Sequence, residues 1–173
     1  MMNHTTLAAR IKTTAYLEGD FTLRSGKKSR YYMDKYLFET QPDILAALGM
    51  RLAAHRTPAT KRIAGAELGG VALAAAASLA AGLPFFIVRN SKKDYGTSKL
   101  IEGLLLPGEH VLLVEDIATT GGQVLEAAKI IQAAGATVEK IVAVIDRQEG
   151  AGENISNAGF RFEALLTKND MGI

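Results

Sequence analysis

The first fifty residues carry a mixed pattern of apolar and polar positions. Apolar residues recur at helical spacing within residues 5–18, at Leu7, Ile11 and Leu17. Residues 21–38, FTLRSGKKSRYYMDKYLF, are typical of two short strands around a Ser-Gly-Lys-Lys turn. The stretch Thr40-Gln-Pro-Asp43 resembles a capping box with proline near the first turn. It predicts a helix whose apolar stripe consists of Ile44, Leu45, Leu48 and Leu52.

From residue 60 onward, near-continuous apolar runs alternate with helical segments. The runs predict strands at 61–67, 84–88, 111–114 and 141–145. The segments between them predict helices at 69–81, ended by Gly82, and at 123–134, ended by Gly135. Such alternation favours a parallel sheet covered by helices on both faces. We expect one more strand, at 160–166, to lie outside the regular alternation. The sequence thus predicts an α/β fold with an N-terminal addition.

Composition narrows the class of protein. A chain of 173 residues, 48% hydrophobic and 22% charged, is typical of one globular domain. Its net charge of +2 does not indicate a nucleic-acid binder. No apolar run approaches the roughly 20 residues of a membrane span, and the N-terminus does not resemble a secretory signal. The absence of cysteine excludes disulfides and thiolate metal sites, and is compatible with a cytoplasmic protein. The three histidines lack the spacing of a metal site.

One stretch, LLVEDIATTGGQV at 112–124, combines two acids with a loop that favours anions. Glu115 and Asp116 follow an apolar strand, and ligands of open α/β sheets bind beyond such strand ends. The next turn, Ile117–Gly122, opens a helix whose free N–H groups suit a phosphate. The acids repel phosphate but accept hydrogen bonds from vicinal hydroxyls, or hold a cation. A phosphorylated sugar satisfies both halves of the stretch.

Other interpretations of this stretch are weaker or remain open. The order of a P-loop is absent, and no Gly-x-Gly-x-x-Gly follows a strand. The bare pattern also fits an ordinary strand-to-helix turn in which a threonine caps the helix.

The stretch VLLVEDIATTGG resembles the phosphoribosyl-pyrophosphate (PRPP) motif of the type I phosphoribosyltransferases. Within them, the whole chain is most similar to the orotate phosphoribosyltransferases. Four further stretches carry this resemblance in order along the chain: FTLRSGKKSRYYMD, GAELGG at 65–70, VRNSKKDYGTSKLIEG at 88–103 and VIDRQEG at 144–150.

The resemblance implies a fold, a reaction and partners. The fold is a mostly parallel sheet flanked by helices, with a hood formed mainly by residues 1–40 and a PRPP-binding core at about 60–150. The reaction transfers 5-phosphoribosyl from PRPP to orotate, releasing pyrophosphate and forming orotidine 5′-monophosphate. Mg²⁺ is the implied cofactor, held mainly by PRPP rather than by protein ligands. A cytoplasmic homodimer without nucleic-acid or membrane partners is also implied.

The resemblance assigns the ribose and phosphate contacts to one motif. Glu115 and Asp116 match the acids that contact the ribose hydroxyls, and we count both among the catalytic residues. The residues expected around the 5′-phosphate are Ala118, Thr119, Thr120, Gly121 and Gly122. Ile117 and Gln123 are also expected to bind PRPP. Thr119 is also expected near orotate.

A lid is implied at Arg89-Asn-Ser-Lys-Lys93, donated by the neighbouring subunit. Lys93 matches the catalytic lysine, and Arg89 matches an arginine that binds PRPP. Asn90 stands where many relatives carry a basic residue, so its assignment as a PRPP ligand is the weaker one. Tyr95 replaces a common histidine. A solvated basic surface loop is the alternative interpretation of this segment.

The remaining assignments concern the pyrophosphate loop and the base. Gly69, within GAELGG, belongs to the loop that faces pyrophosphate, where some relatives carry lysine; the glycines also fit plain helix–strand packing. Arg147 matches the arginine that pairs with the orotate carboxylate, though it also suits a surface ion pair. Arg24 matches a basic residue near PRPP. Tyr32 and Met33 match the base pocket, although Tyr31 and Tyr32 also suit a strand core.

Two alternatives to an orotate enzyme follow from the shared motif. One is a type I phosphoribosyltransferase for a different base. The other is a PRPP-sensing regulator that binds nucleic acid without turnover.

Overall fold

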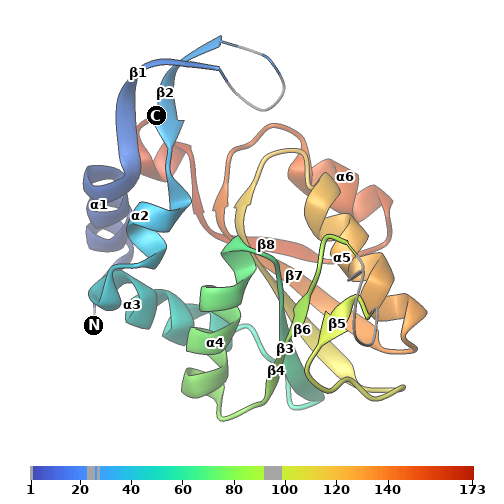
Figure 1. The fold of residues 1–173 in the computed structure, drawn as a ribbon. Helices are drawn as coiled ribbons and strands as arrows, with labels where there is room; N and C mark the ends of the chain where they lie inside the picture. Colours follow the sequence, from blue (N-terminus) through green and yellow to red (C-terminus); the bar gives the residue numbers. More distant parts are fainter. Residues whose placement is uncertain (1, 23–25, 27, 92–98) are drawn as a thin grey trace.

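The computed structural model describes residues 2–22, 26, 28–91 and 99–173. Within these residues, six strands form one sheet in the order β5-β4-β3-β6-β7-β8 (Figure 1). Neighbouring strands are parallel except at the β4–β5 edge, which is antiparallel. The strands are β3 (Thr60–Ala66), β4 (Phe85–Val88), β5 (Ile101–Glu102), β6 (His110–Ala118), β7 (Thr137–Asp146) and β8 (Phe162–Thr167).

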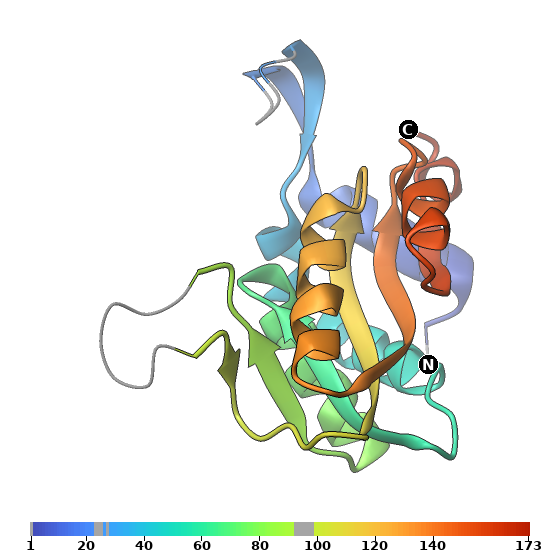
Figure 2. The same cartoon turned by 90° about the vertical axis from the view of Figure 1, so that its right-hand side faces the viewer.

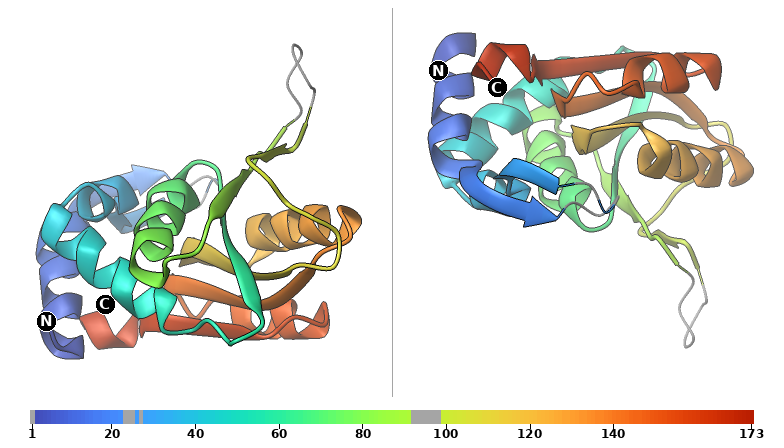
Figure 3. Two further views of the ribbon diagram at one scale, coloured as in Figure 1. Left: turned by 90° about the horizontal axis from the view of Figure 1, so that it is seen from below. Right: turned by 90° about the horizontal axis from the view of Figure 1, so that it is seen from above.

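Helices cover both faces of this sheet (Figure 3). One face carries α1 (His4–Ala15), α3 (Pro42–Ala53) and α4 (Gly69–Ala81), and the other carries α5 (Gly122–Ala133) and α6 (Ala151–Asn157). Because side chains of a strand alternate between faces, Leu112 and Val114 enter the first layer, whereas Val111 and Leu113 enter the second. The two-sided burial explains why the central strands are apolar without a period of two.

The N-terminal segment forms the hood. Strands β1 (Tyr16–Thr22) and β2 (Lys28–Met33) pair in antiparallel fashion, and the hairpin extends above the carboxyl ends of the parallel strands (Figure 2). Helix α2 (Lys35–Glu39) follows, and the short helix η1 (Asn169–Met171) lies near the C-terminus. Tyr31 stacks on Tyr16 with ring centroids 5.3 Å apart. The hood therefore stands over the edge where the loops after β3, β6 and β7 meet.

Most predicted elements of the core are confirmed, with shifted ends. The helix at 69–81 has the predicted bounds, and Gly82 follows it with φ of 66°. Strand β6 is longer than predicted and includes both acids. The strand predicted at 160–166 is confirmed as β8, but its predicted place outside the regular alternation is wrong, because β8 is parallel to β7 and continues the same sheet. The crossover between them is α6, whose seven residues are too few to show a clear helical period.

Two N-terminal predictions are also wrong. The second hood strand does not reach residue 38, because Asp34 Oδ1 accepts a hydrogen bond from the Tyr36 N–H and starts α2. The capping box at Thr40 is absent, because Gln41 is the N-cap of α3 and makes no side-chain capping bond. The Thr40 hydroxyl instead donates to the Tyr36 carbonyl at 2.6 Å. Proline near the first turn of α3 is confirmed.

The strand order places a crevice at the carboxyl end of the sheet. From β3 the chain runs outward through α4 to β4, then returns to β6 on the other side of β3. The loops after β3 and β6 consequently start helices on opposite faces, and open α/β sheets bind their ligands at such a switch point. Those loops are GAELGG and Thr119–Gly122, so the topology brings together two motifs that lie fifty residues apart.

Candidate active site

Glu115 and Asp116 are buried in the last part of β6, with 6% and 2% of their surface exposed. Asp116 Oδ2 forms an ion pair with the ammonium of Lys35 at 2.5 Å, and Oδ1 accepts a hydrogen bond from the Ile117 N–H. Glu115 Oε2 has no hydrogen-bond partner among the described residues. Burial, followed by the neighbouring charge of Asp116, raises the pKa of Glu115 well above its usual value. The Lys35 ammonium thus compensates the charge of Asp116, and the raised pKa of Glu115 favours its protonated form.

A third buried carboxyl group lies close to this pair. Glu39 of α2 is 3% exposed, and its Oε1 finds no hydrogen-bond partner within the described part of the chain. Burial, and then the charge of Asp116, raises the pKa of Glu39 to about 8, while Lys35 opposes the shift. The sequence analysis assigned no role to Lys35 or Glu39. Neither side chain follows a recognisable motif, and only the fold brings α2 to β6.

The loop after β6 presents free backbone N–H groups to the crevice. Gly121 is the N-cap of α5, with φ of 80° and no side-chain capping bond, so no threonine caps this helix. The first N–H groups of a helix lack partners within the helix, and the positive end of its dipole lies there. The Thr120 carbonyl accepts a hydrogen bond from Asn154 of α6 at 2.9 Å, which anchors the loop from the other side. This geometry suits a phosphate group.

The glycines of GAELGG allow α4 to begin directly against the strands. A Cβ at Gly65 would collide with the Gly70 carbonyl, and a Cβ at Gly69 would collide with Asp116 Oδ2. Gly65 and Gly69 are thus needed for the close approach of α4 to the strands. This packing does not exclude a ligand, because the same contacts bring the start of α4 next to the acid pair.

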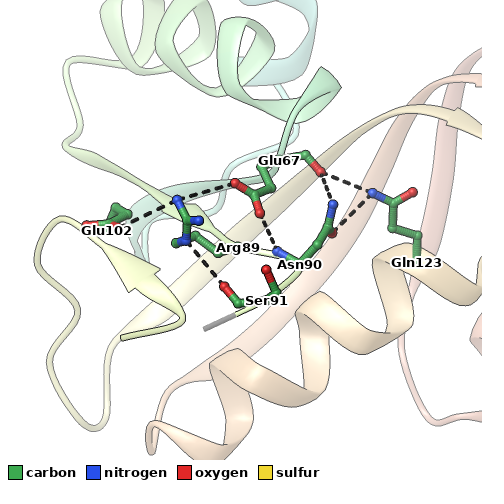
Figure 4. A network of polar contacts seen from close by, with 6 residues as sticks. All are labelled: Glu67, Arg89, Asn90, Ser91, Glu102 and Gln123. Carbon is green, nitrogen blue, oxygen red and sulfur yellow. Dashed lines mark hydrogen bonds and ion pairs between the residues drawn. The ribbon is translucent and has the colours of Figure 1, made fainter. Parts of the chain in front are cut away.

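Glu67 connects this loop to the end of β4 (Figure 4). Its Oε1 accepts a hydrogen bond from the Asn90 N–H at 2.7 Å, and its Oε2 lies 3.6 Å from Arg89 Nη1. Arg89 Nη1 also lies 3.9 Å from Glu102. The Glu67 carbonyl accepts from the side chains of Asn90 and Gln123, at 3.0 and 3.1 Å. One acid thus links three segments that surround the crevice.

A cavity of about 460 Å³ lies beside this network, toward α5. Its described lining residues are Ala66, Val88, Arg89, Asn90, Gly122, Gln123, Glu126, Ala127 and Ile130. Neither Glu115 nor Asp116 belongs to this set. The cavity therefore lies on the side of Arg89, Asn90 and Gln123.

Arg147 follows β7 and lies beneath the hood. Its Nη2 lies within hydrogen-bond distance of the Tyr31 hydroxyl, at 3.3 Å, and forms an ion pair with Glu149 at 3.0 Å. Tyr31 and Met33 line one small pocket with Arg147, whereas Tyr32 packs against Phe21 with centroids 5.6 Å apart and is 43% exposed. Residues two apart on a strand share a face, so the predicted pair Tyr32 and Met33 is divided between two faces. Tyr31 is the residue that the sequence analysis missed, and the period of two was the signal for it.

Several predicted residues lie outside the described part of the chain. These are Arg24 in the hood hairpin, and Lys93 and Tyr95 in the predicted lid. Among the described residues, no group of three or more histidine, aspartate or glutamate side chains is arranged to hold a metal ion. No described helix has the length and apolar character needed to cross a membrane.

Comparison with known proteins decides the family. The family model described as "Phosphoribosyl transferase domain" matches residues 31–166. The chain belongs to the phosphoribosyltransferase family. The matched segment begins within the hood and ends within β8, so it contains the motifs at the switch point and the strands β3 to β7 of this phosphoribosyltransferase.

Relatives of known name extend the similarity over nearly the whole chain. The chain is 44% identical to the orotate phosphoribosyltransferase of Methanocella arvoryzae, with 96% of both chains covered. It is 46% identical to that of Halobacterium salinarum, over 88% of this chain and 87% of the relative. The crystal structure of the Mycobacterium tuberculosis orotate phosphoribosyltransferase in complex with PRPP superposes with a TM-score of 0.82 and 31% identity. That alignment covers 98% of this chain and 99% of the other.

Proposed function

We propose that this chain transfers the 5-phosphoribosyl group of PRPP to orotate, releasing pyrophosphate and forming orotidine 5′-monophosphate in pyrimidine biosynthesis. The observation that carries the proposal is the switch point, where the buried acids of β6 lie next to the loops GAELGG and Thr119–Gly122. The named relatives, which match this chain over most of its length, are orotate phosphoribosyltransferases.

PRPP would occupy the crevice in one orientation. Thr119–Gly122 and the start of α5 receive the 5′-phosphate, and Glu115 and Asp116 accept hydrogen bonds from the ribose hydroxyls. The diphosphate then faces GAELGG, with Gly69 near it and Arg89 on the far side. Asn90 and Gln123 belong to the Glu67 network and shape that side of the crevice. Arg24 completes the PRPP contacts from the hood.

Orotate would lie between the hood and Arg147. A planar guanidinium matches a carboxylate through two parallel hydrogen bonds. Tyr31 and Met33 lie beside Arg147 and support this placement. Thr119 would contact the base from the loop after β6. Tyr32 remains a predicted contact, and its ring would have to approach orotate from the outer face of the hairpin.

Catalysis would rest on charge stabilisation at both ends of the breaking bond. The bond between C1′ and the pyrophosphate oxygen breaks as the orotate nitrogen approaches C1′, so positive charge develops on the ribose and negative charge on the leaving group. Glu115 and Asp116 hold the ribose close to a negative environment, and Lys93 follows the leaving pyrophosphate from the lid. Mg²⁺ bound to the diphosphate would supply further positive charge. With Asp116 already paired to Lys35, we place the metal mainly on PRPP itself.

We also propose a cytoplasmic homodimer in which each subunit closes its lid over the partner's site. Large apolar side chains that remain exposed on and beside α4 support an assembly: Leu79 is 87% and Leu68 is 66% exposed. Residues 1–40 would serve as the hood and residues 60–150 as the PRPP-binding core of one domain.

An acceptor comparison tests this function. The purified protein, PRPP and Mg²⁺ are mixed with orotate, uracil, adenine or hypoxanthine, and pyrophosphate release is measured for each. Release with orotate alone is expected, because only orotate offers Arg147 a carboxylate. Release with a purine but not orotate would favour a transferase for another base. PRPP binding without release for any base would favour a regulator.

A further inference from the structure

The Lys35 ammonium lies between the acid pair and the loop at the start of α4. Three carboxyl groups are each more than nine-tenths buried: those of Glu39, Glu115 and Asp116. The ammonium of Lys35 contacts Asp116. Buried carboxylates are costly unless a positive charge or hydrogen bonds compensate them. A diphosphate brought next to these three groups would add further negative charge. The site therefore needs a cation where the acids and the diphosphate meet.

Lys35 lies at this meeting point. Its Nζ is 2.5 Å from Asp116 Oδ2, and a Cβ built on Gly69 would lie 3.0 Å from the same Nζ. The ammonium thus contacts the acid of β6 while it borders the first residue of α4. Its side chain remains 27% exposed, so a ligand entering the crevice can reach it.

The chemistry of the ammonium suits a bridging role. An ammonium carries three N–H donors, and an ion pair with one carboxylate oxygen occupies one of them. Burial lowers the pKa of Lys35, but the hydrogen bond and charge of Asp116 outweigh it, so the net pKa is raised and the side chain stays charged. A lysine at residue 69 is incompatible with this packing, since even its Cβ would meet Asp116 Oδ2. Lys35 of α2 places its positive charge beside Gly69 instead.

We infer that Lys35 is a PRPP-binding residue whose ammonium bridges Asp116 and the diphosphate at the start of α4. This inference rests on the proposed function, because it requires that the crevice binds PRPP. It assigns a part of the pyrophosphate site to α2, the helix that connects the hood to the core.

Two ligands separate this role from a purely structural one. Inorganic pyrophosphate reports the diphosphate subsite alone, and orotidine 5′-monophosphate reports the ribose and 5′-phosphate subsites without a diphosphate. Calorimetry on Lys35→Met should weaken pyrophosphate and PRPP binding by about ten- to a hundredfold, the range for losing a hydrogen bond to a charged group. Binding of orotidine 5′-monophosphate should change by less than about threefold, because this ligand has no diphosphate for the ammonium to contact.

Controls keep the result unambiguous. Lys35→Arg should recover most of the pyrophosphate affinity, because the charge is retained. Lys129→Met removes an exposed lysine of α5 that pairs with Glu126, and should bind both ligands like the wild type. If Lys35→Met does not fold, Lys35→Gln carries the same expectations.

Three outcomes would overturn the inference, and they are distinguishable. Unchanged pyrophosphate binding in Lys35→Met would show that the ammonium does not contact the diphosphate. Equal losses for pyrophosphate and orotidine 5′-monophosphate would show that Lys35 only holds Asp116 in place. Absence of PRPP binding in the wild type would remove the proposed function together with the inference.

Discussion

At the residue scale, Asp116 has two opposing roles that one substitution can separate. It is 2% exposed and paired with Lys35, which favours a structural role, whereas the proposed contact with the ribose hydroxyls is a binding role. Asp116→Asn keeps the shape of the side chain and removes the charge. We expect PRPP to bind about ten- to a hundredfold more weakly, as for loss of a hydrogen bond to a charged group.

The melting temperature tests the structural role of the same residue. It should fall by less than about 4 °C, the upper end of the shift that roughly 1 kcal/mol produces in a domain of about 150–250 residues. Calorimetric titration with PRPP and a thermal melt measure the two effects. An Asp116→Asn protein that unfolds at room temperature would make the aspartate structural instead.

Glu39 predicts a pH dependence of stability. Unfolded glutamate releases its proton near 4.5, whereas folded Glu39 releases it at about 8. Between these values the folded protein holds a proton that the unfolded chain lacks, so stability falls as the pH rises. Below the lower value both states are protonated, and the effect ends.

Glu39→Gln should remove this part of the slope. Melting temperatures between pH 5 and 8 should fall less steeply in the variant than in the wild type, because a neutral amide replaces the titrating carboxyl. Because the pKa of Glu115 is also raised, part of the pH dependence of stability remains in both proteins. Identical slopes would show that Glu39 is ionised in the folded protein at neutral pH.

At the element scale, the Glu67 network holds the end of β4 against the loop before α4. Glu67→Ala removes the acceptor of the Asn90 N–H and the charge facing Arg89. We expect kcat/KM for PRPP to fall by at least about tenfold, because a hydrogen bond to a charged group contributes about 1.5–3 kcal/mol. Glu67→Gln keeps an acceptor and should lose less. Steady-state kinetics with varied PRPP measure both.

Glu126 provides the matched control for this prediction. It lines the cavity beside the Glu67 network and pairs with Lys129, but it makes no contact within that network. Glu126→Gln should retain wild-type kinetics. If both glutamate variants lose activity equally, the cavity rather than the network governs PRPP use.

Elements of the sheet were more predictable from sequence than those of the hood. Strands β3, β6 and β7 are buried on both faces, so their apolar runs are dense and easy to recognise. Helices α2 and α6 contain five and seven residues, which is too short for periodicity to develop. Their positions depend on tertiary contacts, such as the packing of the buried Phe38 side chain in the core layer that also contains α1 and α3.

The candidate site shows the same division. Glu115, Asp116 and the glycine loops form local motifs, and the sequence shows them directly. Lys35, Glu39 and Tyr31 reach the site from the hood, and their relation to β6 and Arg147 exists only after folding. Motifs close together in sequence could thus be predicted, whereas contacts between distant elements required the fold.

At the scale of the whole molecule, the proposed dimer predicts complementation between two variants that are each inactive at low PRPP concentration. Lys93→Ala disables the lid, and Asp116→Asn disables the ribose site. If each lid serves the partner's site, a mixed dimer contains one site with both intact residues. Mixing the two proteins should restore about a quarter of wild-type activity, the share of sites expected from random pairing of symmetric dimers.

The exchange of subunits must be verified in the same experiment. A tagged and an untagged copy, purified together after mixing, report the formation of mixed dimers. Mixed dimers without recovered activity would place Lys93 over the site of its own subunit.

The most direct test of the central claim is the rate at which orotate is consumed. Purified protein, Mg²⁺ and orotate are followed by the ultraviolet absorbance of orotate before and after addition of PRPP. The account predicts that absorbance falls only after PRPP is added, with one pyrophosphate and one orotidine 5′-monophosphate formed for each orotate lost. Unchanged absorbance, from a folded protein that binds PRPP, would contradict it.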